Sequence, residues 1–289
     1  MQGSQNISAL INLLDDPDQK IFDQISQELL NIGETAVPFL EDAWENSFNA
    51  ILQNRIEQVL HQIQFQGIVK GLQAWKKTEI KPLVEGAILI AKYQYADLDE
   101  DYIYSFIEQL TQDIWLELNG NLTALEKAGV FNKIFFDIMG FGGNKKNFHS
   151  PQNSFINNVL ETKKGSPISL SLLYIEVASR LKVPVYGVNL PELFVLAYTH
   201  LPVQFYDEIG QEDVLFYINP FNKGTIFQKK DIDTFLKQLK IQEKPEFYLP
   251  CDNLSIIKRI LKTLMFTYNK SGYLDKEAEI KLLLDILEA

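Results

Sequence analysis

The sequence predicts an α+β fold that is mainly helical. Apolar residues recur at helical spacing over residues 5–73, and the spacing changes to that of strands over residues 183–227. Helical spacing returns over residues 252–289. A chain of 289 residues can bury a substantial core without cross-links. We therefore expect an ordered globular protein.

Composition and charge exclude several classes of protein. The chain carries 38 acidic and 27 basic residues, a net charge of −11, which argues against nucleic-acid binding because phosphates must be neutralised by cations. One cysteine, Cys251, cannot close a disulfide within the chain, and with three histidines it makes a metal site or metal cofactor unexpected. No segment approaches the ~20 apolar residues of a membrane span. The single thiol and the absence of a basic leader predict a cytoplasmic protein.

The first region, residues 1–74, is predicted to consist of helices. An apolar stripe ends at the acidic turn 15–18, a second stripe ends at Gly33, and a further helix begins around Pro38. This order is similar to a HEAT-type repeat, of which one or two units fit. Such units bury their apolar faces by stacking on a neighbour. We therefore expect a HEAT-like helical region that packs on the next domain.

The middle region, residues 75–240, mixes helices and strands. Ser166 is a good N-cap and Pro167 suits a first helical turn, so the clearest helix is predicted over residues 166–182. Bulky and β-branched residues predict strands. The other predicted helices span residues 81–96, 100–118, 121–138 and 154–162, and the strands span residues 183–190, 194–199, 214–218 and 224–227.

The last region, residues 241–289, carries two helical stripes that are separated at Ser271–Tyr273. The two stripes resemble a single tetratricopeptide-like helical pair. One pair does not make an array of repeats. We therefore expect a packed tail.

Two clusters in the middle region allow more than one interpretation. The glycine-rich run 140–144 lacks the following lysine and the preceding strand of a phosphate-binding loop, so a turn is favoured. The lysine pairs 145–146 and 163–164 are either solvated or form one edge of the footprint of an acidic partner.

Five segments of the middle region, in order, resemble the SirB-type branch of the transglutaminase-like superfamily. They are residues 83–91, 140–144, 153–160, 164–171 and 187–194. The resemblance extends over about residues 75–230. It implies a papain/transglutaminase-like core, in which a helix with a nucleophilic cysteine at its N-terminus packs on a small antiparallel sheet that carries a histidine and an aspartate.

The resemblance also locates the catalytic positions, and none of them holds the residue usual in the wider superfamily, although the SirB-type branch often carries a proline at the first of them. Pro167 matches the nucleophile, Leu193 the histidine and Asn219 the acid. In the superfamily, the helix N-terminus and the imidazolium lower the pKa of the thiol, which then attacks an acyl carbon. Proline offers no nucleophile and leucine carries no proton. Asparagine can orient a histidine, but no histidine remains for it.

These substitutions predict a catalytically inactive protein that uses its remodelled cleft to bind or scaffold an unidentified protein or peptide. The candidate cleft residues are Asn153, Asn158, Ser166, Pro167, Ser169, Asn189, Glu192, Leu193 and Asn219. The asparagines either line the groove or fix loops. One alternative is a divergent hydrolase or acyltransferase in which Ser166 replaces the nucleophile and His149 the base. Another is a structural protein that dimerises through its helical ends. The oligomeric state is not predicted.

Overall fold

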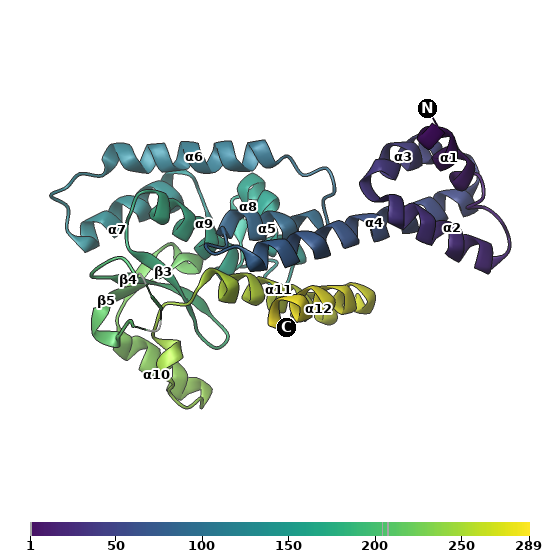
Figure 1. Cartoon of the computed structure of the whole chain (residues 1–289). Helices are drawn as coiled ribbons and strands as arrows, with labels where there is room; N and C mark the ends of the chain where they lie inside the picture. The colour runs from purple at the N-terminus through teal and green to yellow at the C-terminus, as the bar shows by residue number, and fades with distance from the viewer. Residues whose placement is uncertain (1, 204, 207) are drawn as a thin grey trace. The chain divides into compact units, whose positions relative to one another are not determined.

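The chain forms two compact units in the computed structural model, which describes residues 2–203, 205–206 and 208–289. One unit comprises residues 1–71 and 92–96. The other comprises residues 72–91 and 97–289. Helix α4 (Ala50–Lys77) contributes to both units (Figure 1).

The first unit is helical, as the apolar spacing predicts. It contains α1 (Gln2–Ile11), α2 (Gln19–Ile32), α3 (Val37–Glu45) and the first part of α4. The Asp18 side chain caps α2 by accepting a hydrogen bond from the Lys20 amide, and Gly33, with φ +69°, ends the helix. The apolar stripes of these helices meet in one core. Its fully buried members include Leu14, Leu29, Leu40, Ile56 and Val59.

The second unit is built around α9 (Pro167–Arg180), its most buried helix. Ten of its side chains are buried, from Ile168 to Ala178. It packs against α6, α11 and the sheet. The other helices are α5 (Leu83–Lys92), α6 (Glu100–Glu117), α7 (Ala124–Asn132), α8 (Ile156–Thr162), α10 (Lys229–Leu239), α11 (Asn253–Lys270) and α12 (Leu274–Glu288). A π-helical turn, η2 (Lys133–Ile138), follows α7.

Four antiparallel strands form the sheet, in the order β3-β4-β5-β6. They are β3 (Val185–Asn189), β4 (Phe194–Thr199), β5 (Val214–Asn219) and β6 (Thr225–Phe227). Side chains alternate between the two faces of a strand. Val195 and Ala197 pack in a cluster with residues of α10, so Phe194 and Leu196 face the other way, toward α9. Separately, β1 (Gly142–Gly143) and β2 (Lys164–Gly165) form a short parallel pair.

Helix α10 was not predicted from the sequence. Its apolar residues Ile232 and Leu236 are buried, and five of its eleven residues are charged. Ile232, Phe235, Leu236 and Leu239 recur at i, i+3, i+4 and i+7, the spacing of an amphipathic helix, so the sequence does carry the signal for α10. The buried pair and its neighbours gain their stability from packing on the sheet.

The last two helices, α11 and α12, pack on each other and belong to the same compact unit as the core. Helix α11 also contacts α9, β3 and the short turn η3 (Pro151–Ser154). The predicted mainly helical α+β fold is confirmed. Within the described ranges, no helix has both the length and the hydropathy that a bilayer span requires.

Candidate functional site

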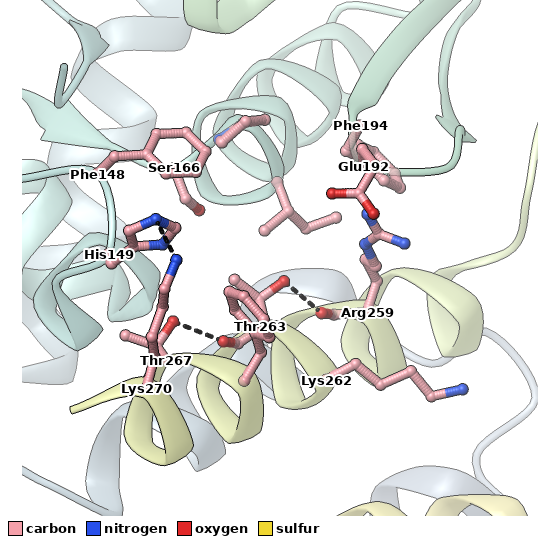
Figure 2. Close-up of a pocket in the computed structure, with 13 residues that line it drawn as sticks. Phe148, His149, Ser166, Glu192, Phe194, Arg259, Lys262, Thr263, Thr267 and Lys270 are labelled. Carbon is pink, nitrogen blue, oxygen red and sulfur yellow. Dashed lines mark hydrogen bonds between the residues drawn. The ribbon is translucent and has the colours of Figure 1, made fainter. Parts of the chain in front are cut away.

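A cavity of about 430 Å³ opens between the N-terminus of α9 and one face of α11. We call it the α9–α11 cavity. Its walls come from the loop before η3, the first residues of α9, the β3–β4 connection and α11 (Figure 2). Three of the predicted cleft residues, Ser166, Pro167 and Glu192, line it. Chain segments about a hundred residues apart in sequence therefore meet at this site.

The α9 wall is held in place by a pair of buried serines. The Ser166 amide donates to Oγ of Ser169 at 2.9 Å, and the Ser169 amide donates back to Oγ of Ser166 at 3.3 Å. Oγ of Ser169 donates in turn to the carbonyl oxygen of Asn153 at 2.6 Å. This arrangement is a capping box closed by a second serine. The Ser166 hydroxyl is thus engaged with its own helix.

His149 lies at the cavity edge opposite α9 and is bonded to α11. Its Nε2 lies 3.1 Å from Nζ of Lys270. An ammonium group only donates, so Nε2 accepts and the ring proton is assigned to Nδ1. No hydrogen bond joins His149 to Ser166 in the structure. The contact that a serine nucleophile and its histidine base require is therefore not formed.

The three positions that match the catalytic residues of the superfamily do not converge. Pro167 lines the cavity. Leu193 packs against the cluster on the α10 face of the sheet, on the side away from Phe194. Asn219 caps the turn after β5, its Oδ1 accepting from the Asn222 amide at 3.2 Å. The φ of +61° at Glu192 directs its side chain into the cavity, toward Arg259 (Figure 2).

The predicted asparagines lie outside the cavity lining. Asn153 is buried and fixes the preceding loop, because its Nδ2 donates to the carbonyl oxygens of Asn147 and Phe148. Asn158 is half-buried on α8. Asn189 lines an adjoining pocket next to Cys251, which shares Arg259 with the α9–α11 cavity. Its buried Oδ1 has no hydrogen-bond partner in the described part of the chain. Of the two interpretations of the asparagines, Asn153 therefore fits the one in which the side chain fixes a loop and does not line the groove.

The α11 wall was missed by the sequence analysis. It presents Arg259, Lys262, Thr263, Phe266, Thr267 and Lys270. These residues recur at intervals of three and four, so they lie on one face of the helix. The signal was therefore in the sequence, as a polar stripe beside the apolar stripe at Ile257, Leu261 and Leu264. The apolar stripe indicates which face of the helix is buried in the core, but spacing alone does not mark the polar stripe as a cavity wall.

Three of these α11 side chains are cations, in a chain whose net charge is −11. Lys262 forms an ion pair with Glu288 at 3.0 Å, and Lys270 donates to His149. In the ranges that the structure describes, the Arg259 guanidinium has neither a hydrogen bond nor an ion pair within 4 Å. Burial lowers its pKa, and the charge of Glu192 opposes that shift. The cavity is therefore cationic.

Cys251 lies outside this cavity, and its thiol is expected to be unreactive. Burial, aided by the charge of Asp252, raises the pKa of Cys251 to about 12. Because the thiolate is the reactive form, we expect labelling of the native protein by a disulfide reagent at pH 8 to be roughly a hundredfold slower than labelling of the urea-unfolded chain. Absorbance of the released thiol measures both rates. Equal rates would contradict the assignment, and Cys251→Ser gives the background.

Comparison with known proteins adds evidence that is independent of the geometry. The family model of the transglutaminase-like superfamily matches residues 102–262. A UPF0162 protein of Xylella fastidiosa (strain 9a5c) is 31% identical over 210 residues, 69% of each chain. Protein SirB1 of Salmonella typhimurium is 25% identical over 212 residues, 72% of each chain. Human F-box only protein 21 is 25% identical over 63% of this chain and 32% of its own length. No solved structure matches the chain.

Proposed function

The chain belongs to the SirB-type branch of the transglutaminase-like superfamily, and from this premise we propose that it is a non-catalytic member that binds a peptide or protein segment in the α9–α11 cavity. The observation that carries the proposal is the loss of reactive groups at the superfamily's catalytic positions. Pro167 carries no nucleophile, and the side chains of Leu193 and Asn219 do not line the cavity. The superfamily's catalytic positions therefore supply this cavity with no nucleophile, base or acid, which favours binding over catalysis.

The cavity has the mixed lining that peptide side chains need. Phe148 and Phe266 offer aromatic surface, and Thr263 and Thr267 contribute polar groups from α11. Both threonine hydroxyls donate to carbonyl oxygens one turn back in α11. A lining that combines apolar surface with polar and charged groups can hold a ligand by both kinds of contact.

The proposal predicts that Ser166 and His149 carry no turnover. We expect release of nitrophenol from an activated ester, and amine incorporation into a glutamine peptide, to proceed at the same rate with the native chain and with His149→Gln. A loss of turnover in His149→Gln, together with Ser166→Gly, would instead support the divergent hydrolase or acyltransferase, because both groups would then be needed.

The binding role is tested by filling the cavity. Thr263→Trp places an indole in the cavity, whereas Leu282→Trp adds the same group to an exposed position of α12. A partner captured from native lysate and identified by mass spectrometry is expected to be lost with Thr263→Trp and kept with Leu282→Trp. Retention by both variants would place binding outside the cavity. Thermal unfolding of each variant confirms that the bait is folded.

The remaining predictions are part of the same proposal. Residues 1–74 and 241–289 are HEAT-like and tetratricopeptide-like flanks of a transglutaminase-like core at residues 75–240. A cytoplasmic location is supported by the single cysteine, and the net charge of −11 supports a partner other than nucleic acid.

A further inference from the structure

We propose that the ligand of the α9–α11 cavity is an acidic peptide segment, whose carboxylate binds Arg259 while a neighbouring apolar side chain lies against Phe148 and Phe266. This inference rests on the proposed function, because it takes the cavity as the binding site. It adds the chemistry of the ligand and the residue that recognises it.

The first step of the argument is the state of Arg259. Its side chain is half-buried, lines the cavity and has no hydrogen-bond or ion-pair partner among the described residues. A guanidinium carries five N–H donors in a planar fork. Withdrawing such a cation from water is unfavourable unless it is paired. The guanidinium of Arg259 can therefore donate two parallel hydrogen bonds to a carboxylate, the geometry in which these two groups bind most strongly.

The second step is the charge around Arg259. Lys262 and Lys270 lie on the same face of α11, and each already has a partner, Glu288 and His149. The positive end of the α9 dipole faces the same space, since Ser166 and Pro167 line it. Glu192 is the carboxylate in the lining, and it acts on Arg259 through its charge without a close ion pair. The electrostatic field in the cavity is therefore positive near Arg259 and favours the binding of a group with one negative charge.

The third step separates a carboxylate from a more highly charged anion. A phosphate group carries nearly two negative charges at neutral pH, and Glu192 would repel both. A carboxylate carries one negative charge, which matches the single positive charge of the unpaired Arg259 guanidinium. The aromatic side chains Phe148 and Phe266 complete the site, because they offer an apolar contact that a free inorganic anion does not use. An acidic residue beside an apolar one in a peptide satisfies both parts.

Three short peptides test the proposal by calorimetry or by amide chemical-shift changes. Acetyl-Gly-Glu-Phe amide carries a side-chain carboxylate, acetyl-Gly-Gly-Phe carries a C-terminal one, and acetyl-Gly-Gln-Phe amide is neutral. At least one acidic peptide is expected to bind at millimolar concentration or below, roughly tenfold tighter than the neutral peptide. Which of the two binds tells whether the natural carboxylate is internal or terminal.

Three variants assign the binding to Arg259. Arg259→Gln is expected to weaken the acidic peptide by roughly tenfold and leave the neutral one unchanged. Lys258→Gln removes the same charge one residue away on α11, outside the cavity lining, and is expected to have little effect. Glu192→Gln removes the competing carboxylate and is expected to strengthen binding roughly threefold, a gain that a merely structural role would not produce.

The outcomes are separable from those of the proposed function. Equal binding of acidic and neutral peptides, or equal loss in Arg259→Gln and Lys258→Gln, would overturn the carboxylate inference and leave the cavity as a binding site. No binding of any of the three peptides would also overturn the inference. The Thr263→Trp capture experiment would then decide the binding role by itself.

Discussion

Gly143→Ala is expected to destabilise the second unit by about 3 kcal/mol, because a methyl group at this position overlaps the ring of Phe221. An added Cβ would lie 2.7 Å from Cγ of Phe221, and closer still to Cδ2 and Cε2. The clash involves the base of the ring, so a small rotation of its tip does not relieve it. Phe221 is itself packed edge-on against Phe148, with ring centroids 5.5 Å apart. The strain is therefore transmitted to the wall of the α9–α11 cavity.

The neighbouring glycine supplies a matched control. A Cβ at Gly142 would lie 3.8 Å from Nζ of Lys164, its nearest neighbour, which is an ordinary van der Waals distance. Gly142→Ala is therefore expected to change the free energy of unfolding by less than about 1 kcal/mol, with the lost backbone freedom of the unfolded chain acting in its favour. Urea unfolding followed by circular dichroism measures both variants. Similar midpoints for the two would refute the packing role of Gly143.

Ser169→Ala is expected to cost about 2 kcal/mol, because it removes the hydroxyl that ties α9 to η3. This hydroxyl accepts from the Ser166 amide and donates to the carbonyl oxygen of Asn153, and the residue is 5% exposed. Removing it leaves the Ser166 amide and the Asn153 carbonyl with only their mutual bond of 3.0 Å. The N-terminus of α9, and with it one wall of the cavity, is expected to loosen.

Ser171 provides the comparison for Ser169 on the same helix. It is also fully buried, but its hydroxyl donates to the carbonyl oxygen of Pro167 one turn back, a bond internal to α9. Ser171→Ala removes no hydrogen bond to another element, so a cost below about 1 kcal/mol is expected. Thermal unfolding and amide hydrogen exchange at the start of α9 distinguish the two. Equal protection in both variants would show that the link from Ser169 to Asn153 does not hold the wall.

The cations that line the cavity are not the lysines that the sequence suggested. Lys163, one of the lysines that flank the family motifs, has its ammonium group 3.7 Å from the ring centroid of Phe106, and burial lowers its pKa. This lysine is therefore part of the packing. The cations that line a cavity are instead those of α11, about a hundred residues further along the chain. An acidic partner remains the prediction, but the cations expected to bind it are those of α11 in place of the lysine pairs 145–146 and 163–164.

The mainly helical α+β class, the SirB-type transglutaminase-like family and the capped start of α9 at Ser166 and Pro167 could be predicted from the sequence. These features could be predicted because each depends on a local pattern: apolar spacing, an N-cap, or an ordered run of motifs. Helix α10 was not predicted, although its apolar residues recur at i, i+3, i+4 and i+7, which is also a local helical pattern.

The set of residues that share the cavity depends on contacts between distant segments and could not be predicted from the sequence. The pairing of Asn189 with Phe194 sets the register of the β3–β4 hairpin, and side-chain alternation then directs Phe194 toward α9 and Leu193 to the opposite face. Likewise, α11 becomes a cavity wall through packing on α9 and η3. A sequence motif shows where a residue stands along the chain. The face on which its side chain lies depends on contacts between distant segments, which local spacing does not encode.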